Sequence, residues 1–223
     1  MLFFRLMSRS IYRSDQQKNL GRVLPDLIRS RRLLKNLVWK DLRVRYRYAV
    51  MGFVWAILEP IALMAILTFI FAFVFAERGE VTGANNPKEF AVQLLCGLIF
   101  WQFIADSIRT ATQSLMSNEN LVKKVYFTRE VIPLAAMGNP FVNLCIGFVI
   151  LLIIQFAMLG TLPGLAILFL PVLLGIQIMI TAGLSLLFSC GNVHYRDIGY
   201  MVNVALLFGF YASPIFYKLD LVM

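Results

Sequence analysis

Three arginines, Arg43, Arg45 and Arg47, stand at alternate positions just before a long apolar segment. A guanidinium group can donate two parallel hydrogen bonds to phosphate oxygens, so clustered arginines at a membrane surface are suited to bind a pyrophosphate headgroup. Basic residues also collect beside membrane spans because they fix the orientation of a chain. The sequence leaves both interpretations of these arginines open.

Glu59 is the single charged residue in the apolar segment 52–76, and Pro60 follows it. An ionised carboxylate inside a bilayer is costly unless it is paired or hydrated. Proline lacks an N–H group and leaves the carbonyl of Ala56 free. The pair predicts either a residue that faces a conduit or a dimer interface, or a carboxylate reached by water beside a helix kink. Trp55 belongs either to the same conduit or to an aromatic belt at the membrane surface.

Side chains for acid–base or metal chemistry are sparse in the loops. Glu119, Glu130, His194 and Asp197 are present, but the chain has no DxD or DDxxD cluster. A membrane enzyme acting on polyprenyl lipids would need several such side chains at one surface, so it is a distant alternative. The three cysteines match neither a disulfide framework nor a CxxC pattern, and we expect no metal site.

The composition predicts an integral membrane protein. The mean hydropathy is +0.76 and 15% of the residues are charged, against about 25% in soluble domains. From Val131 to Tyr195, 65 consecutive residues carry no Asp, Glu, Lys or Arg. Unbroken apolar runs favour helices over barrel strands. We therefore predict an all-α fold with five transmembrane helices, at about 52–76, 90–112, 133–158, 165–189 and 198–217.

Two of the predicted spans depend on short sequence features. The second has only 16 uncharged residues, 90–105, and we expect it to continue through Asp106 and Arg109, which can pair on one helix face at a spacing of three. The stretch LGTLPG at 159–164 supplies the turn between the third and fourth spans.

The basic residues orient the chain. With the N-terminus in the cytoplasm, 18 of the 21 Lys and Arg lie on the cytoplasmic side, as the positive-inside rule requires. The net charge of +9 therefore gives no reason to expect nucleic-acid binding. Residues 1–50 are predicted to form a basic cytoplasmic tail with an amphipathic interfacial helix at 25–48; a merely topogenic tail is the alternative. Residues 51–217 form the membrane domain.

The stretch NENLVKKVYFTREVIP, residues 118–133, places charged side chains between two apolar segments. Asn118 suits a helix N-cap and Glu119 the first turn. Leu121, Val125 and Ile132 then occupy one face. The pattern predicts a short cytoplasmic helix over 118–132, although an ordinary basic loop is the alternative.

Three stretches together resemble the ATP-binding-cassette type-2 permeases that export polysaccharides. They are RVRYRYAVMGFVWAILEP at 43–60, NENLVKKVYFTREVIPLA at 118–135 and NVHYRDIGYMVNVALLFGFYASPIFY at 192–217. The second is similar to the coupling segment of that family. Thr128 stands where the family commonly has proline, and five spans are seen where the family has six, so a sixth span is expected to be missing.

The resemblance implies a transport subunit in the inner membrane of a bacterium. Two copies would form a homodimer, and two copies of a separate ATPase would bind ATP and Mg²⁺, because the chain has no GxxxxGK[ST] motif. The permease itself would hold no cofactor. The implied cargo is a lipid-linked glycan of the O-antigen, capsule or teichoic-acid type; a type-2 exporter of a drug or lipid is the alternative. The implied contacts with the ATPase are Asn118, Glu119, Leu121, Lys123, Lys124, Val125, Tyr126, Phe127, Arg129 and Glu130.

Overall fold

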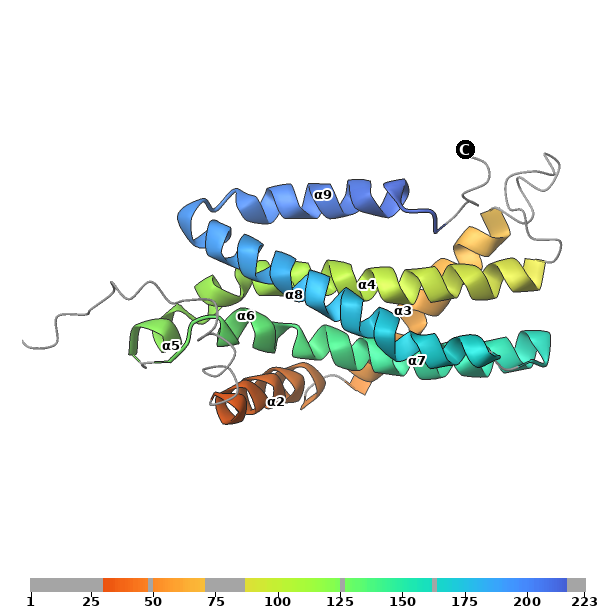
Figure 1. Ribbon diagram of the computed structural model, residues 1–223, viewed down its shortest axis with the longest axis horizontal. Coiled ribbons are helices and arrows are strands. Elements are labelled where there is room, and N and C mark those ends of the chain that lie inside the picture. The colour runs from red at the N-terminus through yellow and green to blue at the C-terminus, as the bar shows by residue number, and fades with distance from the viewer. Residues whose placement is uncertain (1–29, 48–49, 71–86, 125–126, 162–163, 216–223) are drawn as a thin grey trace, which may run out of the picture.

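The computed structural model describes residues 30–47, 50–70, 87–124, 127–161 and 164–215, and these ranges contain helices and no strand. The predicted all-α fold is confirmed for this part of the chain (Figure 1). In chain order the elements are α2 (Arg31–Arg47), α3 (Val50–Phe69), α4 (Pro87–Ser117), α5 (Glu119–Lys124), α6 (Val131–Ala136), α7 (Gly138–Leu159), the 3₁₀ helix η4 (Leu165–Phe169), α8 (Leu170–His194) and α9 (Ile198–Ala212).

Helix α4 is the axis of the structure. Its 31 residues extend about 46 Å at 1.5 Å per residue, and it contacts α3, α6, α7, α8 and α9. Leu94, Leu95 and Leu98 are at most 1% exposed, and Met64 of α3 and Leu144 of α7 belong to the same apolar core. The hydrophobic core of the chain is therefore built around the middle of α4.

Helix α8 packs on α4 through small hydroxyl side chains. Thr181, Ser185 and Ser189 recur every fourth residue and are buried, whereas most of the rest of α8 is exposed. Small residues at this spacing let two membrane helices approach closely. Asn192, one turn further along, is also buried and donates a hydrogen bond to the carbonyl of Thr112 in α4.

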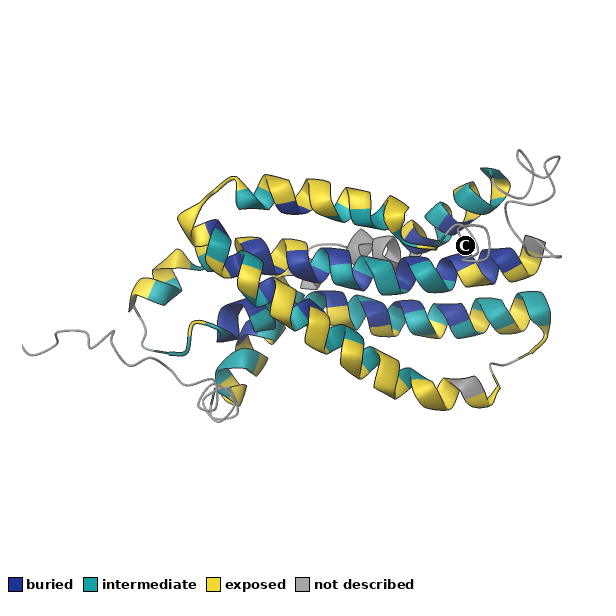
Figure 2. Cartoon of the chain, turned by 45° about the horizontal axis from the view of Figure 1, so that its top comes forward, coloured by how far each residue is buried: buried dark blue, intermediate teal, exposed yellow. Residues whose placement is uncertain are grey.

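The outer surfaces of α8 and α9 are apolar. Figure 2 shows exposed residues along most of both helices, while buried residues concentrate on α4 and α6. A protein surrounded by water rarely exposes apolar patches of this extent, so these faces suit lipid or another chain. The large exposed side chains include Val172, Met179, Leu187, Tyr200, Phe208 and Tyr211.

The lengths of the helices bear on the predicted spans. Among the described residues, three helices are long and apolar enough to cross a membrane: Lys88–Ser117, Val131–Leu159 and Ile167–His194. Leu58–Phe69 and Ile198–Ala212 are shorter apolar helices. Helix α9 ends at Ala212, and the chain turns at Ser213 and Pro214. Residues 216–217 of the predicted last span, 198–217, lie outside the described residues.

Two features expected of the second, third and fourth spans are confirmed. The second span does continue through Asp106 and Arg109, and their side chains pair at 3.0 Å. The third ends at Gly160, whose φ of +67° is the left-handed conformation that glycine adopts readily at a helix C-terminus. The expected turn at 159–164 therefore begins there.

The contact between α2 and α7 gives a test of the packing. A Cβ atom at Gly138 would lie 2.6 Å from both γ-methyl carbons of Val38. Gly138→Ala should therefore lower the free energy of unfolding by about 1–3 kcal/mol, measured in detergent micelles, and Val38→Ala should restore it. Gly183→Ala is the matched control, because that helical position faces open space. Equal stability of the two alanine variants would contradict this packing.

Candidate functional site

The segment predicted as one helix over 118–132 is divided in the structure. Helix α5 covers Glu119–Lys124, residues 127–130 form a bend and a turn, and Val131 begins α6. The single-helix prediction is wrong at residues 127–130, where Phe127 and Thr128 have lower helix propensity than the leucine and lysine residues of α5. The side chains of Lys124, Val125 and Tyr126 lie outside the described residues.

Asn118 joins α4, α5 and α2. Its backbone carbonyl accepts hydrogen bonds from Leu121 and Val122, so it begins α5 as predicted. Its side chain is directed elsewhere: Nδ2 donates to the carbonyl of Ser114 at 2.9 Å, and Oδ1 accepts from Lys40 Nζ at 3.2 Å. The side chain thus fastens the start of α5 to the end of α4 and to α2.

An apolar cluster, which we name the coupling cluster, holds this segment against α2. Its buried members are Leu37 of α2 and Val131, Ile132 and Ala135 of α6. Partly buried neighbours come from α2, α4, α5 and the turn after α5: Leu33, Leu34, Val38, Leu115, Leu121, Val122 and Phe127. The apolar face predicted from Leu121 and Ile132 therefore packs inside the chain.

The surface that α5 presents outward is polar. Glu119, Asn120 and Lys123 are exposed, and Lys123 donates a hydrogen bond to Glu119. The ammonium group of Lys123 lowers the pKa of that carboxyl, with a smaller contribution from Arg196. Arg129 is exposed as well, whereas Glu130 is half-buried and its Oε2 atom is buried without a hydrogen-bond partner.

Helix α2 packs on α6 through part of its apolar face. Leu37 is 8% exposed and belongs to the coupling cluster, so this part of the face covers protein. The interfacial position of the helix stays a prediction. Trp39 and Arg43 are on the outside, with the guanidinium carbon 5.8 Å from the ring centroid, a cation–π contact. The side chains of Arg45 and Arg47 lie outside the described residues.

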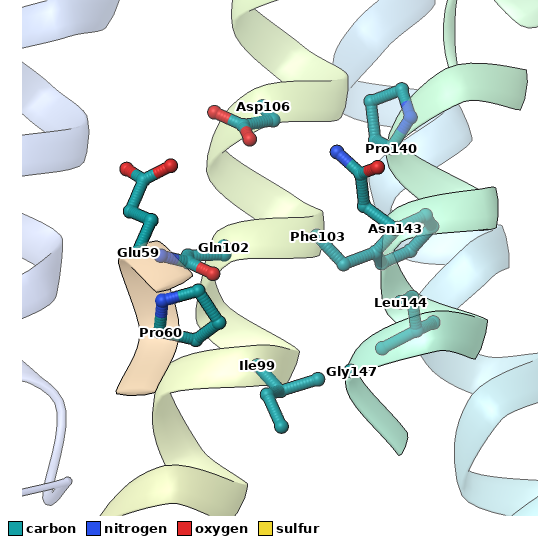
Figure 3. Close-up of a pocket in the computed structure, with 10 residues that line it drawn as sticks. All are labelled: Glu59, Pro60, Ile99, Gln102, Phe103, Asp106, Pro140, Asn143, Leu144 and Gly147. Atoms are coloured by element: carbon teal, nitrogen blue, oxygen red, sulfur yellow. The ribbon is translucent and has the colours of Figure 1, made fainter. Parts of the chain in front are cut away.

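Glu59 and Pro60 line a cavity of about 60 Å³ between α3, α4 and α7. Figure 3 shows Glu59 and Pro60 on one side of α4 and Asn143 of α7 on the other, with Gln102 and Asp106 between them. A volume of about 10–15 Å³ suffices for one water, so this cavity can hydrate the carboxylate. Pro60 is buried and Glu59 is exposed. The side chain of Trp55 lies outside the described residues.

Asn203 of α9 lies at this site, although no local sequence pattern marks it. Arg109 donates from Nε to Asn203 Oδ1 at 3.0 Å and from Nη1 to Asp106 Oδ1 at 3.0 Å. Arg109, Asn203 and Glu59 line one hollow of about 350 Å³. Sequence reasoning found the pair on α4 but missed its partner, because 94 residues separate Arg109 from Asn203.

Asn192 fixes the turn between α8 and α9. Besides donating to Thr112, it accepts a hydrogen bond from the backbone N–H of Gly199 at 3.1 Å through Oδ1. His194 in this turn is exposed, and its Nδ1 lies 3.3 Å from the carbonyl of Cys190. In the parts of the chain that are described, no three His, Cys, Asp or Glu side chains gather as a metal site would require.

Comparison with known proteins gives consistent matches. The model of the ABC-2 type transporter family matches residues 32–222. An O-antigen export system permease protein RfbA of Klebsiella pneumoniae is 33% identical over 193 residues, which cover 85% of this chain and 70% of the relative. A protein of the same name from Myxococcus xanthus is 27% identical over 199 residues, or 89% of this chain and 73% of the relative. The chain is a multi-pass membrane permease related to O-antigen export permeases, and it belongs to the ABC-2 type transporter family.

Proposed function

We propose that the chain is the membrane subunit of an ATP-driven exporter that moves a lipid-linked polysaccharide from the cytoplasm to the periplasm. The observation that carries this proposal is the likeness to O-antigen export permeases over 85% of the chain. Two copies form the conduit in the bacterial inner membrane, with five spans between residues 52 and 217 and the N-terminus in the cytoplasm. Two copies of a separate ATPase bind ATP and Mg²⁺ and hydrolyse the nucleotide.

The segment 118–132 receives the ATPase in this proposal. Its exposed polar residues, Glu119, Asn120 and Lys123, face away from the coupling cluster, and they suit the rim of a protein interface. Lys124, Val125, Tyr126 and Arg129 complete the contact. Asn118, Leu121, Phe127 and Glu130 support the segment from within.

Movement of α5 reaches the membrane helices through contacts already present. Leu121 and Val122 belong to the coupling cluster together with Leu37 of α2 and Val131 of α6, and α7 follows α6 directly after Met137. Because packed side chains shift together when they have no free volume, a pull on α5 displaces α2, α6 and the start of α7.

The cargo contacts in this proposal lie at two levels. Arg43, Arg45 and Arg47 collect the pyrophosphate headgroup at the cytoplasmic surface. Glu59, Pro60 and Trp55 line or gate the conduit within the membrane. Support for the second level comes from the cavity beside Glu59 and the hollow of about 350 Å³ that it shares with Arg109.

The experiment that tests the function measures glycan at the cell surface. A host that lacks its own exporter is given this permease, its ATPase and a lipid-linked glycan. Surface glycan that depends on all three supports the proposal. Transport of a drug or a simple lipid, with no surface glycan, would instead favour the type-2 exporter of another cargo.

The proposed contact with the ATPase predicts that two added carboxylates will weaken the binding of the ATPase. Val125→Asp with Tyr126→Asp should release the ATPase in a pull-down from membranes, because burying unpaired carboxylates at an interface is costly. Membrane abundance of the permease should be unchanged. Asn36→Asp, which adds charge to an exposed position of α2, is the control and should retain the ATPase. If the double variant keeps the ATPase and exports normally, residues 118–132 are only a loop.

Glu59 gives a separate prediction about the conduit. Glu59→Gln preserves the shape and most hydrogen bonding and should insert normally, whereas Glu59→Leu should reduce export at equal protein abundance. Leucine makes α3 a more favourable membrane helix than glutamate does. We therefore expect any loss of export to come from the lost carboxylate and not from reduced insertion. Surface glycan normalised to permease in the membrane is the measurement. Parental export by Glu59→Leu would remove Glu59 from the conduit.

A further inference from the structure

Two hollows follow each other along the seam between α4 and α9, and Asn203 lines both. The first has a volume of about 380 Å³ and is polar, with Gln113, Arg196 and Tyr200 in its walls. The second, of about 350 Å³, combines Arg109 with apolar side chains such as Leu206 and Phe210. The seam therefore changes from polar to apolar along its length.

The ends of the helices locate this seam at one side of the membrane domain. Arg109 lies eight residues before the end of α4 at Ser117, or about 12 Å along the helix axis. Asn203 lies five residues after the start of α9 at Ile198, or about 8 Å. In the proposed orientation both ends are cytoplasmic, so Arg109 lies at the depth of the inner-leaflet headgroups.

Arg109 keeps hydrogen-bonding capacity beyond its bonds to Asp106 and Asn203. A guanidinium has five N–H donors, and Asp106 and Asn203 each accept one. The side chain is 48% exposed, and it lines the second hollow. Two bonds from two different helices fix the plane of the guanidinium, so the remaining donors are held in one direction.

We propose that the seam between α4 and α9 binds the phosphate or pyrophosphate headgroup of a lipid, with Arg109 as the binding residue. This inference rests on the proposed function and assigns the headgroup a position that the sequence did not suggest. Asn203 is a positioning residue. Asp106 competes with the headgroup, because its carboxylate accepts a hydrogen bond from an N–H group of Arg109 that could otherwise donate to a phosphate oxygen.

The charges and the apolar walls favour an amphipathic anion as the occupant. Arg196 lines the first hollow and Glu59 lines the second. The electrostatic potential therefore attracts an anion to the cytoplasmic half of the seam and repels it from the part nearer Glu59. The apolar side chains beside Arg109 suit a hydrocarbon chain. Figure 1 shows α2 on the opposite side of α4 from α9, so Arg43 does not share this seam.

The test uses photocrosslinking in lipid nanodiscs that contain the full chain. Benzoylphenylalanine replaces Leu207, which lines the second hollow and is 58% exposed. The probe is a radiolabelled polyprenyl pyrophosphate. The same polyprenol without phosphate should crosslink at least about tenfold less, because charge-assisted hydrogen bonds are lost. Excess inorganic pyrophosphate should compete poorly, because it lacks the chain.

Two substitutions should act in opposite directions. Arg109→Gln should lower crosslinking by about tenfold or more, and Arg109→Lys should restore part of it. Asp106→Asn should raise crosslinking, because it removes the competing carboxylate. Lys88→Gln, which removes one positive charge near the other end of α4, is the matched control and should behave as the parent.

A purely structural link between α4 and α9 gives different results. Arg109→Gln and Asp106→Asn would then both reduce crosslinking, or neither would change it, and either outcome overturns the site. Equal crosslinking of the polyprenol, or full displacement by inorganic pyrophosphate, overturns the choice of a phospholipid-like headgroup. The surface-glycan assay does not use this probe, so failure of the site and failure of the proposed function are read separately.

Discussion

Helix α4 has to be buried on most of its sides, because α3, α6, α7, α8 and α9 all pack on it. This constraint explains why α4 buries Leu94, Leu95 and Leu98 and why α8 meets it with serine and threonine. It also explains the pairing of Asp106 with Arg109, since charges near the hydrocarbon region are tolerated only when they are paired or hydrated. Helices α3 and α9, which carry Glu59 and Asn203, are positioned by this one element.

The second important contact is the coupling cluster. It uses the apolar side chains of α5 and α6 to hold α2, and Lys40 adds a hydrogen bond to Asn118. A short helix with exposed charges has little stability of its own, so its orientation depends on this packing. The proposed ATPase contact and the membrane helices are thereby joined without a flexible connection among the described residues.

Local features of the structure could be predicted from the sequence, and long-range ones could not. Apolar runs and a charge pair at a spacing of three report on residues that are close along the chain, so the extension of α4 through Arg109 was predictable. The hydrogen bond from Arg109 to Asn203 joins residues 94 positions apart, and no local pattern marks it. The packing of α2 on α6 was not predictable for a related reason, because an amphipathic helix has the same pattern whether its apolar face covers lipid or protein. The turn at residues 127–130 agrees with the low helix propensity of Phe127 and Thr128, a local feature of the sequence.

In the proposed coupling, α5 and α2 move as one unit when the partner ATPase closes. Spin labels at Asn36, Asn120 and Tyr200 test it by pulsed electron–electron distance measurement, with labelled chain diluted in unlabelled chain so that intrachain distances dominate. All three positions are exposed. On addition of ATP to the complex, the distance from Asn120 to Asn36 should stay constant while the distance from Asn120 to Tyr200 changes. A change between Asn120 and Asn36, with none between Asn120 and Tyr200, would contradict the account.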